Sequence, residues 1–366
     1  MPDVTRAEML DHLASIRTKA KSAVLFVPNY AQYPLLTRLI TGKHFRDAPG
    51  GSYAQFIAVK PVNRARNKGY FAKDTTSESN ITAKATAELK FRDIHWVQST
   101  DALLQNKSSA REFDFAVMKE NELAQGKADK MEADLLGAPT TDADDAGPAG
   151  SVRGIQYHVP KFDSGQAGAG FYGGHVGTCT SWQGIARCTS SGNTTSITGD
   201  YTKVRSYEAG GTNYYDDWDD TLLDTFVRSF LAVRAVPPPD MTWATRQSWQ
   251  TLVISNQDSV VGLTKVMRQQ SEDMRGNLTQ MGPQIYSTPI DYEPLLDSDT
   301  DDTIYILDMN TLVVLTEEGG ALSPASPKVY SDFAADSHTT INHFEDWHYE
   351  MWCDDPSRQA AISKAD

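Results

Sequence analysis

The stretch ITAKATAELKFR, residues 81–92, alternates apolar and polar side chains without a break. A period of two over this length predicts a strand with one buried face and one face in water. We interpret it as the return limb of a long hairpin over residues 42–98, with the outgoing limb at 53–59 and the tip at 63–80. Such a hairpin has too little core to be stable alone, so it needs a partner surface on its own body or on a neighbouring subunit.

A long helix is predicted at residues 108–136, shortly after the hairpin. Gly137 ends it and Pro139 follows, which is typical of a helix C-terminus. Charged side chains cover most of its surface, and a narrow apolar stripe remains. We expect that stripe to pack across the surface of a sheet; it consists of Phe113, Val117, Ala124, Ala128, Met131 and Leu135.

The remaining segments mix helices and strands without regular βαβ alternation, and no internal repeat is present, so the fold class is α+β. We expect an N-terminal helix at 5–21 and then an extended arm with one short turn over 23–40, where Pro28 and Pro34 interrupt the chain. Further helices are expected at 218–234 and 257–270. Strands are expected at 251–255, as a pair within 303–315, and at 347–353.

The net charge of −14 is distributed unevenly over the 366 residues. Residues 43–92 hold ten Lys or Arg and four Asp or Glu, a net charge of +6, which leaves −20 for the rest. An acidic chain is not typical of a dedicated nucleic-acid reader, whereas a basic arm on an acidic body favours docking between copies of the chain. A merely solvated strand face is the alternative. The subunit-contact candidates are Lys60, Arg64, Arg66, Lys68, Lys73, Lys84, Lys90 and Arg92.

No residue pattern predicts a catalytic, cofactor or metal site. The glycines at 165–174 lack the Lys-Ser or Lys-Thr of a phosphate loop. Asp297, Asp299, Asp301 and Asp308 have calcium-loop spacing, but Asp302 stands where a glycine is needed. His338, His343 and His348 recur every five residues, which aligns them on neither a helix nor a strand face. Cys179 has no fixed partner base; it either stays a free thiol or pairs with Cys188.

The order of these elements resembles the major capsid protein of tailed bacteriophages, with the Hong Kong 97-type fold. The segment DLLG at 134–137 followed by Gly147, Pro148, Gly150 and Gly154 is similar to the family's turn after its spine helix. The segment IYILDMNTLVV at 304–314 is similar to the family's late A-domain strands. The end, WHYEMWCDDPSRQAAI at 347–362, is similar to its closing strand and the Pro-containing segment behind it.

The resemblance implies an N-terminal arm (1–40), an E-loop hairpin (41–100), a P-domain (101–200) containing the spine helix (108–136), an A-domain (201–325), and a closing P-domain strand with the C-terminus (326–366). Residues 159–211 look like an insertion.

By the same resemblance, the chain is a structural protein and not an enzyme. It would assemble with itself into hexamers and pentamers of an icosahedral shell in the host cytoplasm. The shell would contact its packaged double-stranded DNA non-specifically, and no membrane is implied. Portal, scaffolding or decoration proteins would be its other partners. The alternatives are an encapsulin-type compartment and, from another class, a cytosolic cysteine hydrolase using Cys179.

Overall fold

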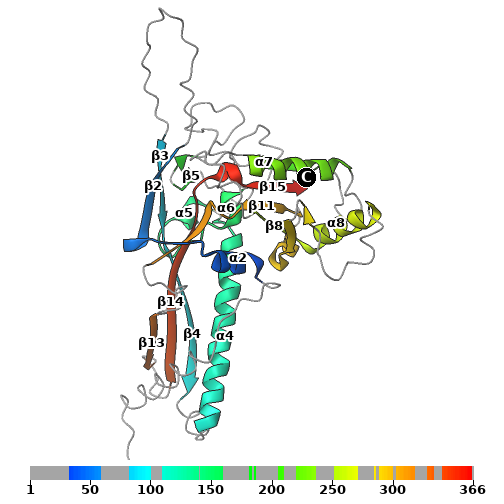
Figure 1. Cartoon of the computed structure of the whole chain (residues 1–366). Helices are drawn as coiled ribbons and strands as arrows, with labels where there is room; N and C mark the ends of the chain where they lie inside the picture. The colour runs from blue at the N-terminus through cyan, green and yellow to red at the C-terminus, as the bar shows by residue number, and fades with distance from the viewer. Residues whose placement is uncertain are drawn as a thin grey trace, which may run out of the picture.

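In the computed structural model, two sheets share one body, with a long helix beside the first and a two-stranded hairpin along one edge (Figure 1). The structure describes residues 33–58, 82–99, 109–139, 141–159, 181–183, 185–186, 205–209, 220–235, 251–270, 284–285, 288–299, 302–317, 328–333 and 340–364. The predicted N-terminal helix at 5–21 therefore lies outside the described residues. Among the described helices, none is both long and apolar enough to cross a membrane.

The first sheet is built around its longest strand, β14 (Thr340–Cys353). The N-terminal half of β14 runs antiparallel between two strands, and its C-terminal half pairs with a third. A short parallel strand completes the sheet. The other members are β4 (Lys90–Ser99), β13 (Lys328–Phe333), β12 (Leu312–Thr316) and β1 (Phe45–Asp47).

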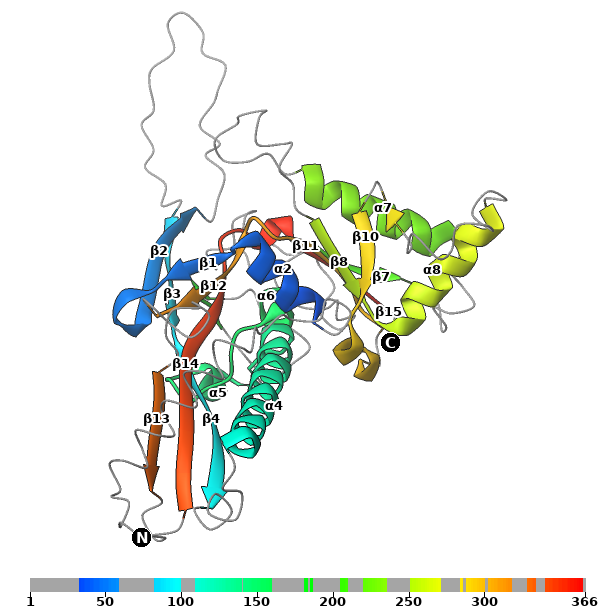
Figure 2. The same cartoon turned by 60° about the horizontal axis from the view of Figure 1, so that its bottom comes forward.

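Helix α4 (Ser109–Leu136) lies beside β4 and β14 (Figure 2). Its predicted bounds differ by one residue from the observed ones, and the Gly137 amide donates to the Ala133 carbonyl at its end. A Cβ on Gly126 would lie 3.2 Å from Ile94 of β4, so the helix and the strand approach closely there. Lys127 Nζ of α4 binds Glu345 Oε1 of β14 at 2.9 Å.

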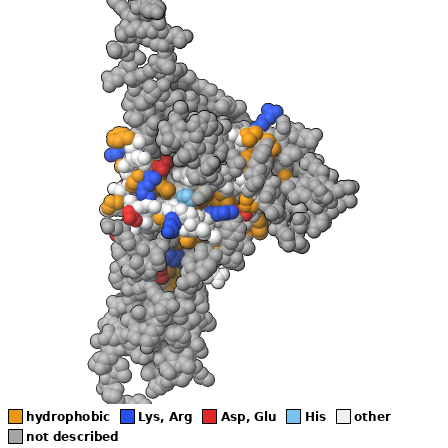
Figure 3. Space-filling view, viewed as in Figure 1, with side chains coloured by type: hydrophobic (Ala, Val, Ile, Leu, Met, Phe, Trp, Pro, Cys, Tyr) orange, Lys and Arg blue, Asp and Glu red, His pale blue; other side chains and the backbone are white. Residues whose placement is uncertain are grey.

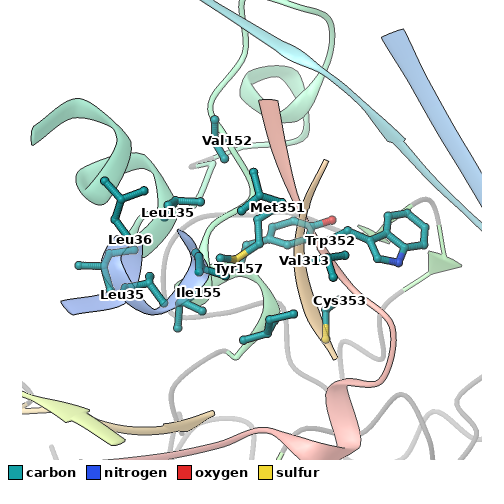
Figure 4. Close-up of a cluster of buried hydrophobic side chains, with 14 of the residues drawn as sticks. Leu35, Leu36, Leu135, Val152, Ile155, Tyr157, Val313, Met351, Trp352 and Cys353 are labelled. Carbon is teal, nitrogen blue, oxygen red and sulfur yellow. The ribbon is translucent and has the colours of Figure 1, made fainter. Parts of the chain in front are cut away.

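The predicted stripe on α4 is buried wherever its side chains are described. Ala128, Met131 and Leu135 are 0–2% exposed, and Ala124 is half-buried. The side chains of Phe113 and Val117 lie outside the described part of the helix. The described stripe packs into a core that also takes side chains from α2, α6, β12 and β14 (Figure 4).

The second sheet has six strands in the order β7-β15-β11-β8-β10-β9. Alternate side chains of its strands face two different cores. Val253 and Ile306 join Phe226 and Phe230 of α7, whereas Ile254 joins the core shared with the first sheet. Because both faces are covered, the central strands are apolar throughout rather than alternating. The elements are β7 (Arg205–Ala209), α7 (Asp220–Ala235), β8 (Thr251–Ser255), α8 (Gln257–Gln270), β9 (Gln284–Ile285), β10 (Thr288–Tyr292), β11 (Ile304–Asp308) and β15 (Ala360–Lys364).

The expectation of a strand pair within 303–315 is wrong. Strand β11 belongs to the six-stranded sheet and β12 to the five-stranded sheet, so the two strands do not pair with each other. The closing segment divides in the same way, because β14 lies in the first sheet and β15 in the second. Gln359, between β14 and β15, donates to Thr311 Oγ1 at 2.6 Å and accepts from the Asp308 amide at 2.9 Å. These bonds join the segment between β14 and β15 to the segment between β11 and β12.

The alternating stretch 81–92 forms two strands rather than one. Strand β3 (Thr82–Glu88) pairs with β2 (Ser52–Ala58) in the hairpin, and β4 begins at Lys90. At Leu89 the chain leaves the hairpin, and its burial phase shifts by one residue. Lys90 is therefore buried and Phe91 is 52% exposed, the reverse of the predicted pattern.

Residues 34–42 form a helix, α2 (Pro34–Gly42), instead of the predicted extended arm. Pro34 stands at its first position, where the missing amide hydrogen and the fixed φ favour a helix start. Leu35, Leu36 and Leu39 are buried on one side of it. The remaining short elements are η1 (Pro49–Gly51), α5 (Asp142–Asp145), α6 (Ile155–His158), β5 (Ser181–Trp182), β6 (Ile185–Ala186), η6 (Pro294–Ser298) and η7 (Pro356–Arg358).

Replacing Met131 by Asp tests the docking of α4. The substitution places an unpaired carboxylate in a site that is 2% exposed, and we expect it to destabilise the fold by on the order of several kcal/mol. Ala133→Asp adds the same side chain at an exposed position on the same helix and should change stability by less than about 1 kcal/mol. Denaturant unfolding of both variants measures the difference, and equal effects would contradict this placement of α4.

Candidate functional site

The β2–β3 hairpin lies along one edge of the body of the molecule (Figure 1). Its two strands pair from Ser52 opposite Glu88 to Ala58 opposite Thr82. One face is exposed, with Phe56 of β2 directly opposite Lys84 of β3. Phe56 is 72% exposed. A large apolar side chain exposed on this hairpin is a candidate contact with another protein surface.

The base of the hairpin is fixed to the end of β14 by a polar and aromatic cluster, which we call the hairpin root: Arg46, Tyr53, Gln55, Trp352 and Asp354. Arg46 binds the Asp354 carboxylate through two nitrogens at 2.9 and 3.2 Å, and also donates to the Tyr53 hydroxyl at 2.9 Å. The Trp352 indole donates to Asp354 at 2.7 Å and meets the Tyr53 ring edge-on at 4.9 Å. This arrangement sets the direction in which the hairpin leaves the body.

One face of β4 is covered by α4, and its other face is exposed. Phe91, Asp93, His95 and Val97 alternate along that exposed side, which we call the outer face of β4. Phe91 packs against His348 of β14 with ring centroids 4.1 Å apart, yet is still 52% exposed. Val97 is 53% exposed. The outer face therefore presents apolar side chains next to a carboxylate and has the composition of a protein-contact surface.

A buried charged cluster lies behind the hairpin, and the sequence patterns did not predict it. Arg153 binds both oxygens of Asp145, at 2.6 and 3.0 Å, and donates to the Thr86 carbonyl of β3 at 2.8 Å. Lys90 donates to the carbonyls of Asp145 and Gly147. Burial lowers the pKa of Lys90, although nearby Glu350 and Asp145 oppose that shift. The cluster joins β3, β4 and the segment after α4.

Glu350 of β14 completes this cluster. Its Oε1 accepts from the backbone amides of Arg153 and Met351 at 2.7 and 3.0 Å. The side chain is fully buried, and burial raises the pKa of Glu350 to about 7, although the Arg153 and Lys90 charges act in the opposite direction. Among the described residues, Oε2 of this carboxyl has no hydrogen-bond partner. The group has a structural position inside the body, away from the exposed surfaces.

Comparison with known proteins shows similarity in fold but not in sequence. No protein-family model and no curated protein sequence matches the chain. Among solved structures, the chain is similar to the capsid protein of cyanophage A-1(L), with a TM-score of 0.55, 11% identity, and coverage of 91% of this chain and 92% of that one.

The capsid protein of a native GTA particle matches with a TM-score of 0.54 at 11% identity, over 93% of this chain and 92% of that one. The capsid protein of Myoviridae phage XM1 matches with a TM-score of 0.50 at 8% identity, over 93% and 95%. The chain has the Hong Kong 97-type capsid fold. The resemblance seen in the order of sequence elements is thus confirmed for the fold as a whole.

The contact residues predicted from sequence have different positions in this capsid fold. Lys84 is exposed on the hairpin. Lys90 is 1% exposed, so it has an internal role and its assignment to a subunit contact is wrong. Arg92 is half-buried and binds Asp134 of α4 at 2.9 Å and the Gly150 carbonyl at 3.0 Å. The other candidates lie outside the described residues: Lys60, Arg64, Arg66, Lys68 and Lys73.

Some of the acidic and histidine residues whose spacing was compared with that of a metal site form ordinary hydrogen bonds in the capsid fold. Asp297 accepts from the Gln257 amide at 2.9 Å, and Asp308 accepts from the Asn310 amide at 3.1 Å. His348 binds Glu317 at 2.9 Å. Within the described part of the chain, no group of three or more His, Cys, Asp or Glu could hold a metal ion. Asp301, His338, Cys179 and Cys188 lie outside that part.

His158, one of the two histidines nearest to Cys179 in the sequence, has a structural role. The Trp182 indole donates to its Nδ1 at 3.1 Å, so that nitrogen accepts and Nε2 carries the proton. Nε2 then donates to the Met351 carbonyl at 3.3 Å. The ring is completely buried. Both nitrogens are engaged within the core of the capsid fold, which leaves neither free to activate a thiol.

Replacing Arg46 by Ala should loosen the hairpin root. Because Arg46 and Asp354 are each about a third exposed, we expect a loss of only about 1 kcal/mol in global stability. Backbone amides in residues 52–58 should nevertheless exchange with solvent several-fold faster. Hydrogen exchange measured by mass spectrometry tests this, with Lys84→Ala on the exposed face of the hairpin as the control. Equal exchange in the two variants would show that the root does not hold the hairpin.

Proposed function

We propose that this chain is a major capsid protein that assembles with itself into an icosahedral shell enclosing double-stranded phage DNA. The observation that carries the proposal is the full-length fold match to capsid proteins, over 91–93% of this chain. The exposed hairpin and the outer face of β4 support it independently. A shell subunit must offer large surfaces to its neighbours, since many modest contacts together stabilise a closed surface.

The elements have natural counterparts in such a subunit. We assign residues 1–40 to the N-terminal arm, the β2–β3 hairpin and residues 59–81 to the E-loop, and α4 to the spine helix. The five-stranded sheet would be the core of the P-domain and the six-stranded sheet that of the A-domain. Residues 159–211 would be an insertion near the boundary between those domains.

The outer face of β4 is the surface that we propose for the hairpin of a neighbouring copy. Asp93 of β4 stands directly opposite Asp346 of β14, which makes this part of the surface acidic, although Lys328 of β13 is also opposite Asp346 and His95 lies 3.9 Å from Asp93. Residues 59–81 contain five Lys or Arg and two Asp or Glu, a net charge of +3. A basic hairpin tip from a second copy would neutralise this acidic pair and cover Phe91 and Val97.

Hexamers and pentamers of the chain, with a portal and any scaffolding or decoration proteins, would complete the shell in the host cytoplasm. Contact with the packaged DNA would be electrostatic and independent of sequence. On the face shown in Figure 3, basic and acidic side chains of the described residues are interspersed. A mixed surface on a chain of net charge −14 favours confinement of the DNA by the shell over tight binding.

The sequence leaves two other functions open. An encapsulin-type compartment would have this same fold and package enzymes in place of DNA, and no described contact favours it. A hydrolase using Cys179 would need a base other than His158, because both ring nitrogens of His158 are engaged in the core. The structural role in a phage shell is therefore the function that the described geometry supports best.

Assembly of the purified chain, imaged by electron microscopy, tests the proposal. We expect rings or closed shells from the full chain. Deleting residues 63–80 leaves residues 59–62 and 81 between the paired ends Ala58 and Thr82, a loop length that hairpins tolerate. This variant should stay folded and form no closed shells.

A matched pair of variants isolates the role of charge in the hairpin tip. Lys68→Glu with Lys73→Glu should impair assembly, whereas Lys68→Arg with Lys73→Arg should assemble normally. Normal shells from both the deletion and the charge reversal would exclude the hairpin as a subunit contact. A stable monomer of the unaltered chain would overturn the capsid proposal itself.

Binding of free subunits to DNA should be weak and should lack sequence preference. We expect mobility shifts only at low salt, with affinity falling steeply as salt increases, because phosphate contacts release counterions. Two duplexes of the same length and unrelated sequence should behave identically. A sequence-specific shift that persists at physiological salt would contradict a purely structural role.

A further inference from the structure

The N-terminus of α2 has no cap of its own. Tyr33 stands at the cap position and makes no side-chain hydrogen bond to the backbone there, and Pro34 has no amide hydrogen. The next two amides, of Leu35 and Leu36, are left to find acceptors. Glu132 of α4 accepts both, through Oε1 at 3.0 Å and Oε2 at 2.8 Å. A side chain 97 positions away in sequence thus caps the helix.

A second carboxyl, from the segment after β10 of the six-stranded sheet, lies next to Glu132. Glu293 lies between β10 and η6, and its side chain is fully buried, as is that of Glu132. The two carboxyls lie close enough to interact directly, and a proton held by one would bond to the other. Glu293 Oε1 also accepts from the Leu295 amide at 3.2 Å, which fixes the turn into η6.

One proton shared between Glu132 and Glu293 would supply the hydrogen-bond donor that their oxygen atoms otherwise lack. Two carboxylates cannot donate to each other, and Oε2 of Glu293 has no donor among the described groups unless one carboxyl is protonated. No Lys or Arg of the described chain forms an ion pair with Glu132 or Glu293. Burial of two negative charges together without a cation would cost several kcal/mol, so the pair retains a proton.

Other groups fix the surroundings of the pair. Tyr33 donates to Asp129 of α4, one turn before Glu132, and Arg38 of α2 lies 3.6 Å from Asp291 of β10. The charge of Asp297 on η6 also acts on Glu293. The negative charge of Asp297 raises the pKa of Glu293, which favours retention of the proton.

We propose that the Glu132–Glu293 pair is a proton-controlled joint between α4 and the turn from β10 into η6. With one shared proton, it holds α2 and α4 against the turn from β10 into η6. Loss of that proton places two carboxylates in contact, and the turn then separates from α4 and the N-terminus of α2. The joint is a property of the single subunit and does not rest on the proposed function.

The direction of the pH effect follows from burial. Burial is the largest cause that raises the pKa of both Glu132 and Glu293 above the ordinary 4.5. A carboxyl with a raised pKa in the closed state contributes fully below 4.5, and that contribution is lost as the pH rises toward its closed-state pKa. The joint is therefore tight in acid and loosens in base, by up to about tenfold in the opening equilibrium per pH unit for one proton.

Hydrogen exchange of the full chain, corrected for the intrinsic pH dependence of exchange, measures this opening. Between about pH 5 and about pH 9, segments 33–42 and 288–299 should lose protection in the unaltered chain. Glu293→Gln supplies a permanent amide donor to Glu132 and should abolish this pH dependence. Glu88→Gln, at an exposed position on β3, makes the same substitution away from the joint and should leave the pH dependence intact.

Two results would overturn the joint. One is corrected protection of segments 33–42 and 288–299 in the unaltered chain that does not change across this pH range. The other is the same loss of protection in Glu293→Gln as in Glu88→Gln. If Glu293→Gln fails to fold, Glu132→Gln replaces the other partner, retains one acceptor for α2, and carries the same expectation.

Discussion

The structure depends on the buried contact between β14 and the segment that returns after α4. Glu350 accepts the Arg153 amide, and the Arg153 guanidinium in turn holds Asp145 and the Thr86 carbonyl. Lys90 fixes the same loop through two carbonyls. Removing one member would leave an uncompensated buried charge, so this network specifies one arrangement of β3, β4 and β14 more than it adds net stability.

The turn after α4 shows how closely the backbone packs around that network. A Cβ on Gly154 would lie 2.4 Å from the Leu135 carbonyl oxygen, and one on Gly150 would lie 2.3 Å from that of Asp144. Only glycine permits these approaches. The motif by which the sequence resembles capsid proteins at this point thus has a direct steric reason in the chain itself.

Many contacts join the elements inside the body, whereas several apolar side chains remain exposed on its surface. Gln359 and Arg358 bind the chain segments that pass between the two sheets, and α2 contacts α4 through Glu132 and β10 through Arg38. In contrast, the hairpin and the outer face of β4 leave Phe56, Phe91 and Val97 largely exposed. Apolar side chains exposed on the hairpin and on the outer face of β4 are suited to contacts with another protein surface.

The sequence by itself determined the local elements and their order. The bounds of α4, β8 and α8 follow from apolar periodicity and helix ends, which are properties of neighbouring residues. Only the tertiary structure decided which strands pair with each other and which side chains are buried. Strands β11 and β12 look like one hairpin yet join different sheets, and Lys90 looks like a surface residue yet is buried, since the burial phase shifts at Leu89. The capping of α2 by Glu132 and its meeting with Glu293 were equally hidden, because pairing across such distances depends on packing that no local pattern encodes.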